Sequence, residues 1–223
     1  MNDDTGGATD PHTRTIAAHR ALVELQLVLS EDVIRFQDML AENPDDQFAR
    51  RGLVKGVLAK VEGLTFALKH LTLHSAGAFA PPGVRLLTPA EEALLQDAAY
   101  HLDAKGKASC AEAHLSLPRN VKFAFATFAR VYGLDFTLET DRHDGWGAFE
   151  RTIGVRNRLV HPKSPSALVV ADEELSQAQD AYRWFSGEHE RVMTAAFEAL
   201  GRWREEAGRG EPLTRPPRLP REK

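Results

Sequence analysis

The chain has 223 residues, of which 43% are hydrophobic and 27% charged, and its formal net charge is −4. This balance is ordinary for a globular protein and argues against one that wraps broadly around nucleic acid, which would need an excess of basic residues. No apolar run approaches the roughly 18 residues of a membrane span, and the polar start MNDDTGGATD lacks the features of a secretory signal. The single cysteine, Cys110, excludes an internal disulfide, so we expect a cytoplasmic protein.

The N-terminal third is predicted to contain two long helices. Residues 1–13 are polar and contain glycine, and they are expected to be disordered. Apolar residues then recur at helical spacing over about 15–42 and again over about 46–74, and the breaker NPDD separates the two runs. Because this link is short, the two helices should pack antiparallel.

Residues 75–118 are predicted to be an insertion between the second and third long helices. The segment 75–83 contains Pro81-Pro82 and is expected to be a loop. Thr88 and Glu91 have the spacing of a capping box around Pro89, which predicts a short helix to about residue 99. The turn DAKG that follows indicates an irregular excursion or a small hairpin.

Three further helices are predicted over 120–132, 144–161 and 172–206. Gly133 ends the first, and Pro162 ends the second because proline disfavours helical geometry in the residue before it. The tail, residues 207–223, is rich in proline and arginine and is expected to be disordered.

The pattern as a whole predicts an all-α, up-and-down helical bundle. A single helical domain over residues 14–206 would carry the insertion at 75–118.

The helix predicted over 144–161 carries the most informative residues. Its stretch RTIGVRNRLVHPK contains four basic residues and no acidic one, namely Arg151, Arg156, Arg158 and Lys163. A local basic strip on an acidic protein suits a small phosphate-binding site, although a solvated helix face has the same composition.

A helical projection of this segment separates its faces. Residues 146, 149, 153 and 160 form the stripe expected to face the core, with Asn157 and His161 beside it on one flank and Arg156 on the other. Arg156 and His161 are roughly 7.5 Å apart along the axis, so their long side chains could converge on one anion. Val155 and Leu159 project on the opposite side, where a partner subunit or the excursion at 84–118 would cover them.

The motif RNRLVH resembles the signature of HEPN domains, in which an arginine and a histidine are separated by four to six residues. Arg156, Asn157 and His161 match it with a four-residue gap, and the helix WGAFERTIGVRN leading into HPK is similar as well. The earlier stretch RRGLVKGVLAKVEGLTFALK also resembles the second helix of HEPN-like proteins. The resemblance covers about residues 15–205.

The resemblance implies a dimeric helical bundle in which two copies of the motif meet in one cleft, and a metal-independent endoribonuclease without a cofactor. His161 would be the general acid or base, and Arg156 would hold the phosphate. Asn157 would orient either the phosphate or the imidazole of His161. The remaining roles implied are attraction of the RNA backbone, by Arg151, Arg158 and Lys163, and the dimer interface, by Val155 and Leu159.

Three other readings bear on partners and chemistry. Family members often act as toxins or in antiviral defence, so the resemblance is compatible with an antitoxin or a defence-system partner. The tyrosine that nucleotidyltransferase antitoxins modify is absent after His161, which argues against an antitoxin of that type. A non-catalytic module that binds nucleotide, RNA or protein is the alternative to the nuclease. Metal binding by His70 and His74, one helical turn apart, is not expected because no third ligand lies nearby in the sequence.

Overall fold

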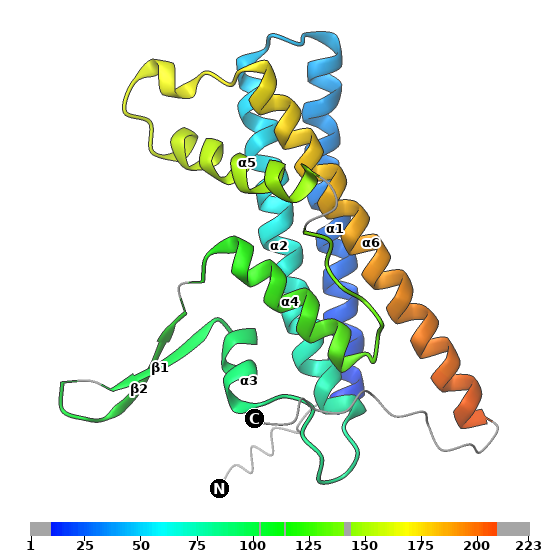
Figure 1. Cartoon of the computed structure of the whole chain (residues 1–223). Helices are drawn as coiled ribbons and strands as arrows, with labels where there is room; N and C mark the ends of the chain where they lie inside the picture. The colour runs from blue at the N-terminus through cyan, green and yellow to red at the C-terminus, as the bar shows by residue number, and fades with distance from the viewer. Residues whose placement is uncertain (1–9, 103, 114, 141–143, 209–223) are drawn as a thin grey trace, which may run out of the picture.

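The computed structural model describes residues 10–102, 104–113, 115–140 and 144–208, and in them the chain forms a helical bundle with one small hairpin (Figure 1). The bundle confirms the predicted fold class. Its six α-helices are α1 (Pro11–Glu42), α2 (Gln47–Phe79), α3 (Pro89–Leu95), α4 (Leu117–Val131), α5 (Asp144–Val160) and α6 (Asp172–Gly208).

Helix α2 is the centre of the bundle, because it packs against α1, α3, α4, α5 and α6. The helices α1 and α2 run antiparallel, as the short link predicts, and α4 and α5 lie across them (Figure 1). The α1–α2 contact is unusually close at Gly52, where an added Cβ would lie 2.1 Å from Cε1 of Phe36. Glycine at this position therefore leaves the space on α2 that the ring of Phe36 fills.

The ends of the long helices differ from the predicted ones. Helix α1 begins at Pro11, where the Asp10 carboxylate accepts the N–H of Thr13 at 3.3 Å, so residues 11–13 are helical and the expected disorder over 1–13 is wrong there. Residues 1–9 lie outside the described part of the chain. At the other end α6 continues to Gly208, two residues into the segment expected to be disordered, and residues 209–223 are not described.

Helix α2 also runs longer than predicted, to Phe79, so the loop expected from residue 75 begins only at Ala80. Tertiary contacts explain the extension: the hydroxyl groups of Ser75 and Tyr132 lie 2.7 Å apart in the core, and Ala76 is buried. The sequence signal for a break, Pro81-Pro82, lies just beyond the helix end.

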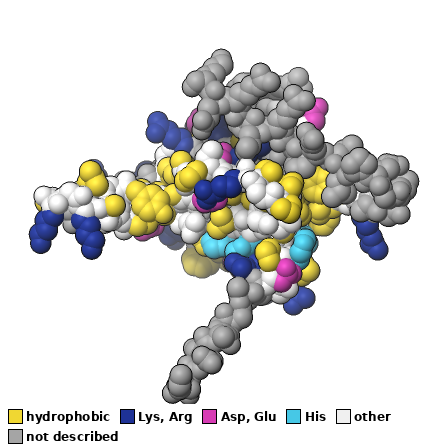
Figure 2. Space-filling view, turned by 90° about the horizontal axis from the view of Figure 1, so that it is seen from below, with side chains coloured by type: hydrophobic (Ala, Val, Ile, Leu, Met, Phe, Trp, Pro, Cys, Tyr) yellow, Lys and Arg dark blue, Asp and Glu magenta, His cyan; other side chains and the backbone are white. Residues whose placement is uncertain are grey.

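The insertion contains the predicted capping box at Thr88 and Glu91, followed by a hairpin. Its strands β1 (Ala98–Leu102) and β2 (Ala108–Glu112) pair antiparallel. The base of the insertion is held by Arg130 of α4, which donates to the carbonyl of Leu86 and to Glu91, each at 2.6 Å. Seen from below, the hairpin is an arm that stands clear of the bundle, with basic side chains at its far end (Figure 2).

One large hydrophobic core joins all six helices, and a smaller cluster lies where α5, α6 and the start of α2 meet. None of the described helices combines the length and hydropathy that a bilayer span requires.

Candidate functional site

The motif occupies the last turns of α5 and the residue after it. Arg156 and Asn157 are helical, and the backbone N–H of His161 donates to the carbonyl of Asn157 at 3.0 Å, which completes the final turn. Pro162 lacks an N–H and follows directly, so the helix ends here as predicted. The imidazole of His161 is exposed, and in the described part of the chain it has no hydrogen bond or ion pair.

Arg156 turns toward α2 and forms an ion pair with Glu62, with Nη2 and Oε1 2.8 Å apart. Its side chain is only 26% exposed, and its Nε is buried without a hydrogen-bond partner. Glu62 is half-exposed and is the partner found for Arg156 among the described residues. The guanidinium is thus held in place from one side by a carboxylate through Nη2, while Nη1 has no hydrogen bond in the described part of the chain.

Asn157 and His161 lie on the exposed face of α5, one turn apart, and Gly154 precedes them on the same face. An added Cβ at Gly154 would meet nothing within 4 Å, so the helix backbone is open to an approaching molecule there. Within one chain the motif therefore divides: His161 and Asn157 face outward, whereas Arg156 is anchored against α2. No contact joins Arg156 to His161 in the described structure.

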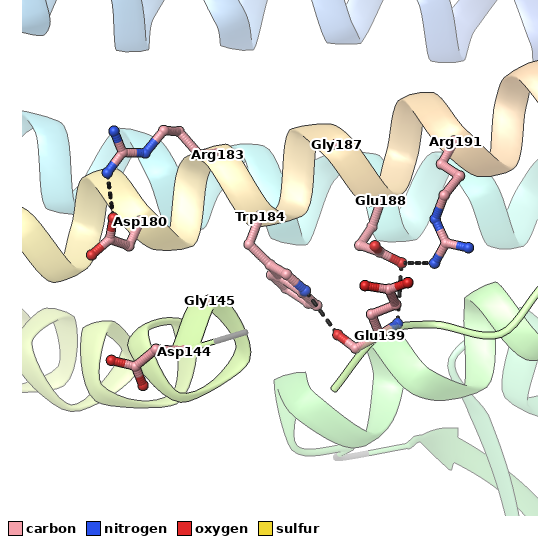
Figure 3. A pocket seen from close by; sticks show the side chains of 9 residues that line it. All are labelled: Glu139, Asp144, Gly145, Asp180, Arg183, Trp184, Gly187, Glu188 and Arg191. Carbon is pink, nitrogen blue, oxygen red and sulfur yellow. Dashed lines mark hydrogen bonds and ion pairs between the residues drawn. The ribbon is translucent and has the colours of Figure 1, made fainter. Parts of the chain in front are cut away.

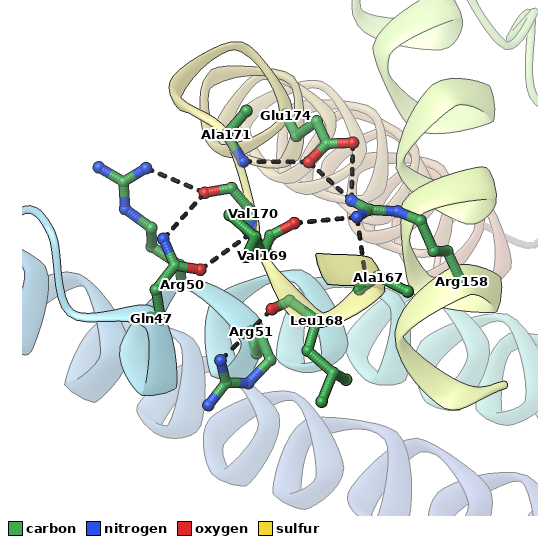
Figure 4. Close-up of polar contacts among 10 residues, drawn as sticks. All are labelled: Gln47, Arg50, Arg51, Arg158, Ala167, Leu168, Val169, Val170, Ala171 and Glu174. Carbon is green, nitrogen blue, oxygen red and sulfur yellow. Dashed lines mark hydrogen bonds and ion pairs between the residues drawn. The ribbon is translucent and has the colours of Figure 1, made fainter. Parts of the chain in front are cut away.

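Arg158 has a structural role, which corrects the expectation that it attracts RNA. Its guanidinium donates to both carboxylate oxygens of Glu174, at 2.8 and 2.7 Å, and to the carbonyls of Ala167 and Val169 (Figure 4). Both bonds to the carboxylate come from Nη2, and hydrogen bonds between two charged groups are stronger than those between neutral ones. Because these donors are used within the fold, Arg158 is not available to bind phosphate.

The segment after the motif is clamped from the α2 side as well (Figure 4). Gln47 both donates to the carbonyl of Val170 and accepts its N–H, at 3.2 and 2.8 Å. The buried Arg50 donates to the same carbonyl and pairs with Asp172 at 2.7 Å. Together with Arg158, these contacts fix residues 167–172 and so define the path of the chain between His161 and α6.

Val155 and Leu159 are buried in the core of the single chain, which corrects their expected place in a dimer interface. They pack in the smaller cluster with Val54, Val170 and Ala178. The apolar residues opposite the predicted core stripe are thus covered by α2, α6 and the segment before α6, and neither a partner nor the 84–118 excursion is needed to bury them. Conversely Val160, expected in the core stripe, is 49% exposed.

The other basic residues of the strip are exposed. Arg151 pairs with Asp144 at the start of α5, at 3.0 Å, and such exposed pairs are weak enough to exchange for a phosphate. Lys163 is exposed beyond the end of α5. The basic strip thus contains fewer available charges than its composition indicates, because Glu62 and Glu174 neutralise two of its four cations.

A hollow of about 590 Å³ lies at the opposite end of α5 from His161 (Figure 3). Two ion pairs lie within its lining, Arg191 with Glu188 at 2.5 Å and Arg183 with Asp180. Trp184 donates its indole N–H to the carbonyl of Glu139 at 2.9 Å. The hollow contains no residue of the motif, and its polar contacts hold the segment before α5 against α6.

The described residues include no group of three or more histidine, cysteine or acidic side chains placed to hold a metal ion. His70 and His74 have ring centres 6.3 Å apart on α2.

Sequence reasoning missed the two carboxylates that hold the arginines of the motif helix. Glu62 is 94 residues from Arg156 in the chain. In the sequence Glu62 stands out only as part of the stretch that resembles the second helix of HEPN-like proteins. That resemblance does not say that Glu62 pairs with Arg156. No protein-family model, no curated protein and no solved structure matches this chain.

Proposed function

We propose that this chain is a metal-independent endoribonuclease of the HEPN type that works as a homodimer. The observation that supports it is the end of α5, where an exposed imidazole and an exposed amide lie on one side of the helix and a guanidinium held by a carboxylate lies on the side that faces α2. These are the groups needed to cleave a phosphodiester without a metal: an imidazole that can carry a proton, and a fixed cation for the charge that grows on the phosphate oxygens.

In the proposed reaction a base removes the proton of the ribose 2′-hydroxyl, and the 2′-oxygen attacks the adjacent phosphorus. The bond from phosphorus to the 5′-oxygen breaks, and an acid protonates that leaving oxygen. The products are a 2′,3′-cyclic phosphate and a 5′-hydroxyl end. His161 carries one of the two proton transfers, and Arg156 stabilises the charge on the non-bridging oxygens.

The two proton transfers give a physical reason for a dimer. They require a base and an acid at the same time, and the motif of one chain contributes one imidazole. Two copies facing each other across the exposed surface of α5 would contribute two, and Gly154 would allow the helices to approach closely. With Val155 and Leu159 assigned to the core, this surface with Gly154, Asn157 and His161 is the contact we propose.

One observation favours the alternative, a non-catalytic module that binds RNA, nucleotide or protein. Glu62 competes with a phosphate for Arg156, and a permanently paired arginine would contribute little to catalysis. The nuclease therefore requires that phosphate displace or share the contact with Glu62.

Purified protein is incubated with a mixed panel of RNAs in excess chelator, and the ends of the products are identified. We expect cleavage with cyclic-phosphate ends, lost by at least about 100-fold in His161→Ala and in Arg156→Ala. The matched controls are His101→Ala, an exposed histidine on the hairpin, and Arg35→Ala, an arginine in an exposed ion pair on α1.

Intact RNA across the panel, or cleavage that survives both motif variants, would refute the nuclease. Binding of the same RNAs without cleavage would support the alternative, a non-catalytic module that binds RNA. Sedimentation at micromolar concentration tests the dimer separately, and a monomer over the whole range in which RNA is cleaved contradicts the two-chain site.

A further inference from the structure

A second group of functional side chains lies between α1 and α6, and it includes no residue of the α5 motif. A cavity of about 370 Å³ opens there, which falls within the roughly 300–1,000 Å³ typical of small-molecule sites. Polar lining comes from His19 and Gln26 on α1 and from Ser186, His189, Glu190 and Thr194 on α6. The rest of the lining is mostly apolar, with Leu22, Val23, Met193 and Phe197.

His189 is the most unusual residue of this cavity. It is only 2% exposed, and its Nε2 is buried without a hydrogen-bond partner in the described part of the chain. The Nε2 of His19, on the facing helix, is likewise buried and unpartnered. A buried polar atom that is left unsatisfied costs about 1–3 kcal/mol, so two such nitrogens on residues that line one cavity favour a ligand whose binding, with a small rotation of these rings, would satisfy them.

Lys60 lies behind this lining and has a buried charge without a counterion. It is 4% exposed, and its Nζ donates to Oγ of Ser186 at 3.2 Å and lies 4.4 Å from the ring centre of Tyr182. No carboxylate within ion-pair distance of it is found among the described residues. Burial accordingly lowers the pKa of Lys60.

The other two buried cations of the described chain each have a carboxylate partner, which Lys60 lacks. Arg50 pairs with Asp45 and Asp172, and Lys69 pairs with Asp97. A buried cation is ordinarily matched by a carboxylate, because an uncompensated charge in a low dielectric is expensive. Lys60 departs from this rule at the place where its hydrogen-bond partner, Ser186, lines a cavity.

We propose that the α1–α6 groove binds a small carboxylate with an apolar tail. The carboxylate head lies at Ser186 and His189, where it accepts hydrogen bonds and supplies the negative charge that compensates Lys60. The tail lies along Val23, Met193 and Phe197. Glu190 is exposed at the rim, and its negative charge disfavours the head there, so the head is directed inward.

The test is a titration of isotope-labelled full-length protein with hexanoate, followed by the NMR signals of the His19 and His189 side chains. Hexanamide, which has the same tail and no charge, is the matched ligand control. We expect saturable shifts with hexanoate and binding of hexanamide weaker by about tenfold or more, because hydrogen bonds to charged groups are the stronger ones. Equal binding of the two ligands, or no saturable shift with hexanoate, would overturn the proposal.

Lys60→Met tests the role of the buried charge. The variant should fold, because an apolar side chain of similar length replaces an uncompensated cation, and it should bind hexanoate about tenfold more weakly. Lys55→Met, an exposed lysine on the same helix, is the matched control and should bind as the wild type does. If Lys60→Met does not fold, Ser186→Ala carries the same expectation. Undiminished binding in the folded variant would refute the assignment.

Discussion

His189 should make the stability of this protein sensitive to mild acid. Its side chain is buried at the groove between α1 and α6, and burial together with the nearby charge of Lys60 lowers its pKa from the ordinary value near 6.5 to about 4. Other groups that share its surroundings are His19 on α1 and Glu190 on α6, which line the same cavity. In the unfolded chain His189 regains its ordinary pKa.

The sign and size of the effect follow from this difference. Between pH 6.5 and 4 the unfolded chain takes up a proton at this position and the folded chain does not, so the free energy of unfolding falls as the pH falls. Each tenfold change in proton affinity corresponds to about 1.4 kcal/mol, which gives a loss of roughly 3 kcal/mol by pH 4. Above pH 6.5 the contribution is constant.

The assay is urea unfolding of the wild type and of His189→Gln at several pH values from 7.5 to 4. Carboxylates elsewhere titrate in both proteins, so the informative quantity is the difference between the two free energies of unfolding. We expect the wild type to lose about 3 kcal/mol more than His189→Gln over this range. Parallel pH profiles would show that His189 is not buried in the neutral form, and the reasoning would fail.

Three further predictions test other parts of the structure. Leu159→Ala should lower the free energy of unfolding by about 2–5 kcal/mol at every protein concentration, because the Leu159 side chain lies in the core of the single chain. A loss that changes with protein concentration would instead place Leu159 in a dimer interface. Lys69→Met should destabilise by about 3 kcal/mol in thermal unfolding, since it leaves the carboxylate of Asp97 without its partner, and an unchanged midpoint would contradict the buried pair. Glu62→Gln should tighten RNA binding a few-fold in fluorescence anisotropy, measured in a His161→Ala background, because it removes the competitor for Arg156, and weaker binding would count against that competition.

Local sequence signals were sufficient for the helices and for most of their ends. Three such signals act within one or two helical turns: the capping box at Thr88, Gly133 after α4 and Pro162 after α5. Their effect on the helix ends can therefore be predicted without knowing the fold. The end of α2 was predicted too early, because burial of Ala76 and the contact of Ser75 with Tyr132 extend the helix. Ser75 and Tyr132 are 57 residues apart in the chain, so a local sequence signal does not reveal their contact.

The candidate site could be located from the sequence, but its geometry could not. The order of residues placed Arg156, Asn157 and His161 at the end of one helix, because spacing along a helix is set by local backbone geometry. Which side of that helix is buried depends on how many neighbours cover it. A projection that assumed one core face left Val155 and Leu159 to be covered by a partner subunit or by the excursion at 84–118, and the resemblance favoured the partner. In the structure α2 and α6 enclose both residues.

Composition and spacing alone determined that this chain is a helical bundle with a histidine at the end of its fifth helix, and the structure showed that this histidine is exposed. The tertiary structure alone decided the pairing of charges: Glu62 with Arg156, Glu174 with Arg158, and no carboxylate with Lys60 among the described residues. The physical reason is that helix formation is governed by neighbours in sequence, whereas the partners of a charged side chain are set by segments that meet only when the chain has folded.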